Sequence, residues 1–126
     1  MTSDITLYII SDSIGETGEL IGRAAIRQFI SEKFEIKRYP YVSKEEQIRE
    51  IFDEAKDGIS IVLYTTVQIN IAHYINQKGL EYNIPTIDIM SEPLMAIENL
   101  LGFAPKREPG LIRRLDENYF KKVEAV

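Results

Sequence analysis

The feature that most restricts the fold of this chain is an apolar strand pattern that passes directly into a glycine- and hydroxyl-rich turn and then into a helix. Residues 5–10 (ITLYII) are apolar or β-branched, which is typical of a buried strand. Residues 11–18 (SDSIGETG) form the expected turn. Apolar residues then recur at helical spacing, at Leu20, Ile21, Ala24, Ala25 and Phe29. A strand followed at once by a helix indicates an α/β fold.

The same alternation of strand and helix continues along the chain. Residues 34–42 are only half apolar, which favours a strand near the edge of a sheet. Residues 59–65 are an apolar run, as in a central parallel strand buried on both faces, and a fourth strand is predicted at residues 84–89. Short connections between these units imply parallel strands and right-handed crossovers. We therefore expect an open, flavodoxin-like or Rossmann-like sheet with flanking helices and strand order 2-1-3-4.

Local signals mark the ends of the predicted helices. Ser43 and Glu46 have the spacing of a capping box, so a second helix is expected to begin there. The third helix is expected to end at Gly79. Pro93 lies in the first turn of a fourth helix, which is expected to end near Gly102.

The pattern changes after the fourth helix. We expect residues 1–102 to form one three-layer α/β domain. Residues 103–126 are expected to form a basic loop marked by proline and glycine, and then a helix that Asp116 begins. No C-terminal cap ends that helix, so we interpret it as cut short.

Composition excludes several classes of function. The 126 residues contain no cysteine, which excludes disulfides, cysteine nucleophiles and thiolate metal sites. The net charge is -5 and no long basic run offsets it, so we expect no nucleic-acid partner. No apolar run approaches the ~20 residues that span a bilayer, so we expect no membrane segment and a cytoplasmic location. The single histidine, His73, has no partner at metal-ligand spacing, and we predict no metal site.

The predicted strand order brings two loops to one crevice. Ligands of such sheets bind at the switch point, which here falls between the first and third strands. Residues 11–18 and 65–68 follow these two strands, and free N–H groups at the start of a helix can hold an anion there. The predicted substrate-binding residues of these loops are Ser11, Asp12, Ser13, Gly15, Thr17, Thr65 and Thr66.

A purely structural interpretation of the first loop stays open. Ser13 and Glu16 have capping-box spacing, and the glycines could serve only to permit the turn. Two features favour a ligand. The loop has three hydroxyl side chains, which is more than capping needs. Asp12 follows the strand directly, where it could act as a base, a metal ligand or a hydrogen-bond acceptor.

A phosphate bound at this loop would need a cation from elsewhere, because Asp12 and Glu16 repel it. The dense positive cluster of the chain is Lys106, Arg107, Arg113 and Arg114. It is either a solvated loop or a phosphate clamp that folds back over the crevice, and we include it in the predicted substrate-binding site. No glycine is followed by lysine, so the chain has no P-loop, and the glycine order of dinucleotide sites is absent too. We predict no catalytic residue in this chain.

Two segments resemble a known family. Residues 9–17 (IISDSIGET) resemble the opening motif of the bacterial pyruvate, phosphate dikinase regulatory proteins, in which a strand is followed by Ser-Asp-Ser-Thr-Gly-Glu-Thr-Ala-Glu. Residues 109–111 (PGL) and 115–125 (LDENYFKKVEA) resemble the later Pro-Gly…Leu-Asp-Glu-x-Tyr-Phe-x-Arg-Ile/Val-Glu-Ala segment of that family. Ile14 and Gly18 depart from the usual threonine and alanine.

The resemblance implies the N-terminal half of a bifunctional regulator. Members of the family use ADP to phosphorylate a threonine of pyruvate, phosphate dikinase, or act on the related phosphoenolpyruvate synthase. They also remove that phosphate with inorganic phosphate, which yields pyrophosphate. Their P-loop lies in the C-terminal half, outside the part that this chain resembles. The resemblance thus implies ADP and inorganic phosphate for the full-length enzyme, and neither a cofactor nor kinase activity for this chain alone.

Two other functions stay open. The first is a free-standing flavodoxin-like module whose first loop holds phosphate or the phosphate of a mononucleotide such as FMN. The loop after Tyr64 has no aromatic residue that would flank the flavin ring, which weakens this alternative. The second is a non-catalytic interaction domain that forms a homodimer through an exposed hydrophobic surface.

Overall fold

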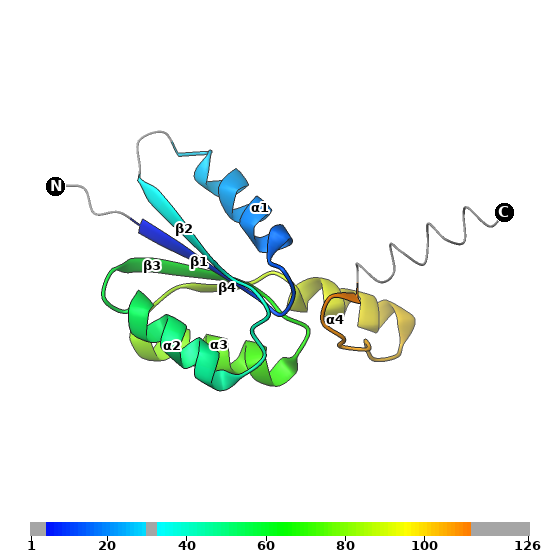
Figure 1. Cartoon of the computed structure of the whole chain (residues 1–126). Helices are drawn as coiled ribbons and strands as arrows, with labels where there is room; N and C mark the ends of the chain where they lie inside the picture. Colours follow the sequence, from blue (N-terminus) through cyan, green and yellow to red (C-terminus); the bar gives the residue numbers. More distant parts are fainter. Residues whose placement is uncertain (1–4, 30–32, 112–126) are drawn as a thin grey trace.

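The computed structural model describes residues 5–29 and 33–111, and this part has an α/β fold built on one open sheet (Figure 1). The strands are β1 (Ile5–Ser11), β2 (Phe34–Tyr39), β3 (Ile59–Thr65) and β4 (Thr86–Asp88). Neighbouring strands are parallel and their order is β2-β1-β3-β4. The predicted fold class and strand order are confirmed, and the half-apolar strand β2 lies at an edge as expected.

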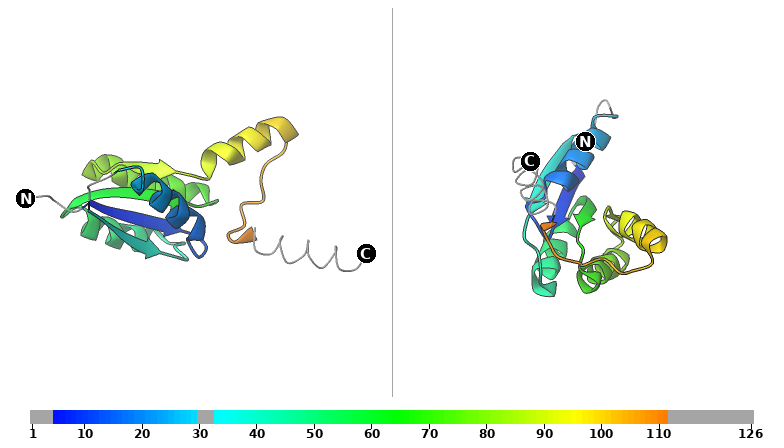
Figure 2. Two further views of the ribbon diagram at one scale, coloured as in Figure 1. Left: turned by 90° about the horizontal axis from the view of Figure 1, so that it is seen from above. Right: turned by 90° about the vertical axis from the view of Figure 1, so that its right-hand side faces the viewer.

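Helices lie on both faces of this sheet. They are α1 (Glu16–Ile26), α2 (Glu45–Ala55), α3 (Ile69–Tyr82) and α4 (Ser91–Leu101). Helix α1 covers one face, whereas α2 and α3 lie side by side on the other (Figure 1). Helix α4 follows β4 and projects beyond the edge at which the strands end (Figure 2). None of the helices in the described ranges has the length and apolar character needed to cross a bilayer.

The two sides of β1 contribute to two separate cores, because successive side chains of a strand point to opposite faces. Tyr8 and Ile10 belong to the larger core, which α2 and α3 complete with fully buried side chains such as Phe52 and Ile75. The smaller core, on the α1 side, is formed by Leu7, Ile9 and Leu63.

Helix α1 approaches the sheet through small residues. Gly18 and Gly22 are its buried positions. A Cβ atom on Gly18 would lie 2.9 Å from Cγ2 of Ile9, and one on Gly22 would lie 2.5 Å from Cδ2 of Leu7. The large apolar residues that predicted the helix lie elsewhere on its surface, and Leu20 is 72% exposed. Glycine thus sets the distance between α1 and β1.

The start of α1 differs from the prediction. Its N-cap is Gly15 at φ 88°, a left-handed conformation that glycine adopts without strain, and no side chain caps the helix. The predicted capping box of Ser13 and Glu16 is therefore wrong. The N–H of Ser13 donates to Oγ of Ser11, and its carbonyl accepts from the N–H of Tyr41. These bonds hold Ser13 in the loop, two residues before the N-cap.

The start of α2 also uses a different residue from the predicted one. The side-chain oxygen of Gln47 accepts hydrogen bonds from the backbone nitrogens of Ser43 and Lys44, at 2.9 and 3.0 Å. Gln47 therefore takes the role that the spacing assigned to Glu46, because the helix begins one residue later than the capping-box spacing implies.

Several other helices and strands end at residues different from those predicted. Helix α3 continues through Gly79 to Tyr82 and ends at Asn83, whose φ is 57°. Gly79 lies where α3 comes close to β4 and does not end the helix, since a Cβ there would lie 2.5 Å from Cγ2 of Thr86.

The remaining ends were predicted with mixed success. Strand β2 ends at Tyr39, and β4 is shorter than the predicted residues 84–89. The fourth helix ends before Gly102 as predicted. The helix predicted from residue 116 lies outside the described residues.

Candidate functional site

The loops after β1 and β3 meet at the edge where these strands end. The backbone N–H of Asp12 donates to the carbonyl of Thr65 at 3.2 Å. The carboxylate oxygen Oδ2 of Asp12 accepts a hydrogen bond from the hydroxyl of Thr66 at 3.1 Å and one from the N–H of Val67 at 2.8 Å. Thr65 and Thr66 are buried. The expectation that these two loops share one place is confirmed, whereas ligand binding there stays a prediction.

Hydrogen bonds to its own residues and to the segment after β2 hold the first loop in shape. The hydroxyl of Ser11, a buried residue, accepts from the N–H of Ser13 at 3.0 Å. The carbonyls of Ser11 and Ser13 accept from the backbone nitrogens of Val42 and Tyr41, each at 2.8 Å. The hydroxyl of Ser11 therefore has a structural partner, so the loop is preorganised before any ligand arrives.

Sequence reasoning missed Arg38, which supports this loop from β2. Its Nε donates to the carbonyl of Ile14 at 2.6 Å, and its Nη1 lies 3.5 Å from a carboxylate oxygen of Glu19. A Cβ on Gly15 would lie 3.0 Å from the same Nε. Arg38 pairs with Ile9 in the β1–β2 register, which brings it beside the loop. Only knowledge of that register could have identified it.

The segment at residues 103–110, here called the basic strap, crosses this edge of the sheet. Arg107 lies in the strap at φ 58°, and its Nη1 donates to the carbonyl of Val67 at 2.9 Å. At its far end, a Cβ on Gly110 would lie 3.5 Å from Oγ of Ser13. The strap therefore contacts both loops of the candidate site. Arg107 therefore lies beside the loop after β3, whereas a role as phosphate clamp stays a prediction.

Other predicted site residues are not part of this cluster. Lys106 and Thr17 are exposed, and the described residues give their side chains no hydrogen bond or ion pair. Gly15 contributes its backbone conformation at the start of α1. Arg113 and Arg114 lie outside the described residues. The predicted residues that the structure brings together are thus Ser11, Asp12, Ser13, Thr65, Thr66 and Arg107.

The cluster contains one carboxylate, Asp12, and one guanidinium, Arg107, both hydrogen-bonded to the backbone of Val67. Both hydrogen bonds to Asp12 fall on Oδ2, so within the described ranges Oδ1 has no hydrogen-bond partner and can accept a proton or a hydrogen bond from a ligand. Arg107 has five N–H donors, of which Val67 engages one. Among the described residues no three acidic or histidine side chains converge as metal ligands would. The arrangement suits a hydroxyl-bearing substrate together with an anion.

The end of β4 has a structural carboxylate. Asp88 accepts hydrogen bonds from the backbone nitrogens of Met90 and Ser91, at 3.1 and 2.9 Å, and from the hydroxyl of Ser91. Burial, and then the charge of Asp88, raises the pKa of Tyr64 above its usual value. Asp88 is thus occupied in starting α4, so we regard Asp12 as the better candidate for contact with a ligand.

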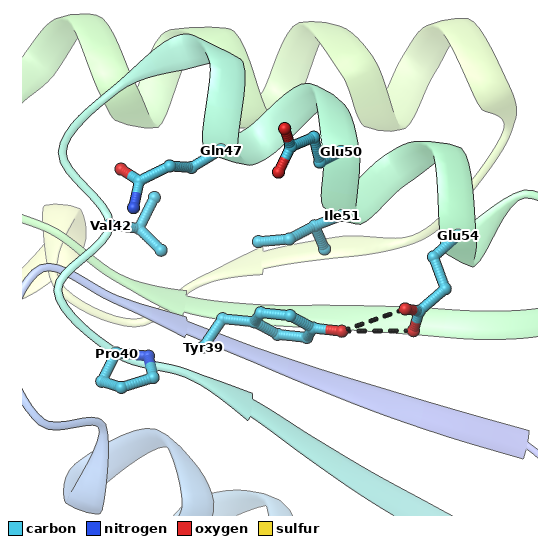
Figure 3. A pocket seen from close by; sticks show the side chains of 7 residues that line it. All are labelled: Tyr39, Pro40, Val42, Gln47, Glu50, Ile51 and Glu54. Carbon is cyan, nitrogen blue, oxygen red and sulfur yellow. Dashed lines mark hydrogen bonds between the residues drawn. The ribbon is translucent and has the colours of Figure 1, made fainter.

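A second polar cluster lies on the face of the sheet that α2 and α3 cover, beside α2. Glu54 accepts hydrogen bonds from the hydroxyl of Tyr8 and from Nζ of Lys37, the latter at 2.8 Å. It also accepts from the hydroxyl of Tyr39 (Figure 3). The Lys37 hydrogen bond lowers the pKa of Glu54 and raises that of Lys37. Burial, assisted by Glu54, raises the pKa of Tyr8 to about 12. This cluster was not predicted from the sequence.

Two hollows lie away from the predicted crevice. One, of about 300 Å³, opens beside the second cluster (Figure 3). Its lining residues are Tyr39, Pro40, Val42, Gln47, Glu50, Ile51 and Glu54. The other, of about 320 Å³, lies between α3 and β4. In the first hollow the charge of Glu54 is already matched by Lys37, so we regard the edge at Asp12 as the better candidate for chemistry.

Comparison with known proteins identifies the family. A family model described as kinase/pyrophosphorylase matches residues 7–126. A relative named pyruvate, phosphate dikinase regulatory protein, from Alkaliphilus metalliredigens, is 47% identical over 123 residues, which cover 98% of this chain and 44% of the relative. One of the same name from Alkaliphilus oremlandii is 43% identical over 124 residues, covering 98% of this chain and 45% of the relative. One from Staphylococcus aureus is 38% identical over 124 residues, covering 97% and 46%. The chain therefore spans just under half the length of these relatives, and it belongs to the kinase/pyrophosphorylase family.

Proposed function

We propose that this chain is the N-terminal part of a regulator that uses ADP to phosphorylate a threonine of pyruvate, phosphate dikinase. The same regulator would remove that phosphate with inorganic phosphate and release pyrophosphate. Two findings support the proposal: the family is described as kinase/pyrophosphorylase, and the relatives carry the name of dikinase regulatory proteins. Because the chain spans less than half of those relatives, we assign the activity to the whole regulator.

The observation that carries the proposed site is the meeting of Asp12, Thr66 and Arg107, which come from three separate segments. Asp12 and Thr66 are joined directly, and Arg107 reaches the same loop through the carbonyl of Val67. Such a convergence at the carboxyl edge of a parallel sheet is typical of ligand sites in α/β proteins. We infer that the dikinase threonine and the phosphate that it receives or loses are held at this edge.

The proposed chemistry goes beyond the sequence prediction, which gave Asp12 a substrate-binding role and no catalytic one, and assigns this residue the role of proton acceptor. In the forward direction the threonine oxygen bonds to the β-phosphorus of ADP, the bond from that phosphorus to the bridging oxygen breaks, and AMP leaves. The hydroxyl proton moves to Oδ1 of Asp12, as to the carboxylates that serve protein kinases. Arg107 would offset the negative charge that Asp12 and Glu16 present to the phosphate.

The absence of a P-loop motif from these 126 residues limits what the chain can do alone. A P-loop holds the nucleotide phosphates through backbone N–H groups and a lysine, and no glycine of this chain precedes a lysine. We therefore expect the chain by itself to transfer no phosphate from ADP. Nucleotide binding would come from the remaining part of the regulator.

A chimera tests the proposal. Residues 1–126 would replace the matching part of the Alkaliphilus metalliredigens relative, and transfer of labelled phosphate from ADP to pyruvate, phosphate dikinase would be measured. The chimera is expected to transfer phosphate, whereas the Asp12→Asn chimera is expected to lose about 100-fold or more in rate, the usual contribution of a general base. Asp57→Asn, an exposed carboxylate after α2, is the matched control and should leave the rate unchanged.

Three outcomes would contradict the proposal. An inactive chimera beside an active parent would reject this chain as the corresponding part of the regulator. An unchanged rate in the Asp12→Asn chimera would reject the role of Asp12. Phosphate transfer from ADP by the isolated chain would show that no further nucleotide site is needed.

A further inference from the structure

Helix α4 presents large apolar side chains to solvent. None of its eleven residues is buried, and Leu100 is 87% exposed. The other large apolar residues exposed on α4 and in the turn after it are Met95, Ile97, Leu101 and Phe103. Figure 2 shows why: the helix projects beyond the sheet, away from α2 and α3. We call these five residues the α4 surface.

A helix of this kind is not stable by its own sequence. Isolated helices shorter than ~12–15 residues are marginal in water, and most helical stability in proteins comes from packing. Exposed apolar residues that cluster on one element are, in addition, typical of an interaction surface. The α4 surface therefore needs a polypeptide that packs on it.

The sheet is also incompletely covered on the face that carries α1. Leu63 lies opposite Ile9 in the β1–β3 register and opposite Ile87 in the β3–β4 register, so these three side chains share one face. Helix α1 packs over β1 and β3, and no described helix lies over β4 on this face (Figure 1). Ile87 is 44% exposed as a result, and Ile21 of α1 is exposed too. We call Ile21 and Ile87 the open face.

We propose that the part of the regulator which the relatives carry in addition to the matched segment packs on the α4 surface and on the open face. The relatives match 97–98% of this chain, and the matched segment is only 44–46% of their length, so more than half of each relative lies outside it. The inference rests on family membership and not on the proposed activity.

A second copy of the chain is a poorer fit to these observations. A symmetric pair would have to place the α4 surface of each copy on the open face of the other, or leave one of the two surfaces uncovered. Here both the α4 surface and the open face, which lie on different elements, have to be covered. A covalently joined unit also has a high effective concentration, so it can cover both without a strong intrinsic affinity. Self-association remains a measurable outcome of the test.

Thiol labelling tests this interface, because the chain contains no cysteine. Leu100→Cys reports on the α4 surface and Ile21→Cys on the open face. Leu80→Cys is the matched control, since Leu80 is 78% exposed on α3, on the other face of the sheet. Each variant would be labelled in the 126-residue chain and in the chimera with the Alkaliphilus metalliredigens relative, and the background from the unsubstituted chimera subtracted.

We expect Leu100→Cys and Ile21→Cys to react at least about tenfold more slowly in the chimera than in the chain, because burial allows reaction only after local opening. Leu80→Cys should react at the same rate in both. Equal rates at all three positions would overturn the proposal. So would protection of Leu100→Cys in the chain alone that increases with protein concentration, since that result assigns the surface to a second copy.

A second measurement does not depend on labelling. Leu100→Glu should leave the melting temperature of the isolated chain nearly unchanged, because the side chain is exposed there. The same change should lower the melting temperature of the chimera, where a buried charge is costly. Leu80→Glu should lower neither. An unchanged melting temperature in the Leu100→Glu chimera would contradict the interface even where phosphate transfer is normal.

Discussion

The carboxylate of Asp12 accepts a 2.8 Å hydrogen bond from the backbone nitrogen of Val67, a residue that follows a different strand. The carbonyl of the same Val67 accepts from Arg107 at 2.9 Å. One residue in the loop after β3 is thus held from both sides, by the loop after β1 and by the basic strap. This double attachment fixes the loop after β3 at this edge of the sheet and leaves Oδ1 of Asp12 available to a ligand.

The first prediction concerns the structural share of Asp12. Asp12→Ala removes the acceptor for the Thr66 hydroxyl and the Val67 N–H, and it should lower the free energy of unfolding by about 1–3 kcal/mol. Asp12→Asn keeps one side-chain oxygen as an acceptor and should cost less than half as much. Urea unfolding of the chain measures both. Equal losses would mean that the negative charge, and not the acceptor, holds the loop.

The second prediction concerns the approach of α1 to the sheet. Gly22→Ala should lower the free energy of unfolding by about 1–3 kcal/mol, because its Cβ would lie 2.5 Å from Cδ2 of Leu7 in a packed core. Gly18→Ala should cost less, since its closest contact is 2.9 Å. Gly58→Ala, at which a Cβ meets no atom within 4 Å, is the control and should change stability by no more than about 1 kcal/mol in either direction. Stability unchanged in Gly22→Ala would mean that α1 can move away from β1 at no cost.

The arrangement of the sheet was predictable because it depends on local patterns and on general rules of chain connection. The apolar run at residues 59–65 has the pattern of a strand with both faces covered, and β3 is central. Parallel strands all end at one edge, so the meeting of the loops after β1 and β3 followed from the strand order alone. Asp12 could be placed in the crevice for the same reason.

The contacts that support the site depend on tertiary neighbours that a single sequence does not reveal. Arg38 reaches the first loop because β2 pairs with β1 in one particular register. Arg107 was placed in the crevice only as one of two alternatives, since its contact with Val67 spans 40 residues of sequence. Ser13 matched a capping box, but hydrogen bonds to Ser11 and Tyr41 were stronger constraints than the helix end.

The third prediction concerns alkaline pH and the polar cluster beside α2. Burial raises the pKa of Tyr8 from 10.0 to about 12, with a contribution from the hydrogen bond to Glu54. Above pH 10 the unfolded chain loses this proton before the folded chain does. The stability that protonated Tyr8 contributes is therefore fully present below pH 10 and is lost as the pH rises from 10 to about 12.

Tyr8→Phe removes this titration and should make the free energy of unfolding fall less steeply between about pH 10 and about pH 12. The difference in slope should amount to roughly 1–2 kcal/mol over that interval, less than the full linkage value because Glu54 is half exposed to solvent. The pKa of Lys37 is raised as well, chiefly by its hydrogen bond to Glu54, and Lys37 is present in both proteins. Urea unfolding at several pH values measures the slopes.

Tyr41→Phe, at an exposed tyrosine, is the control and should retain the slope of the unsubstituted chain. If Tyr8→Phe and the unsubstituted chain lose stability in parallel, Tyr8 ionises in the folded state as readily as in the unfolded state, and burial does not protect its proton.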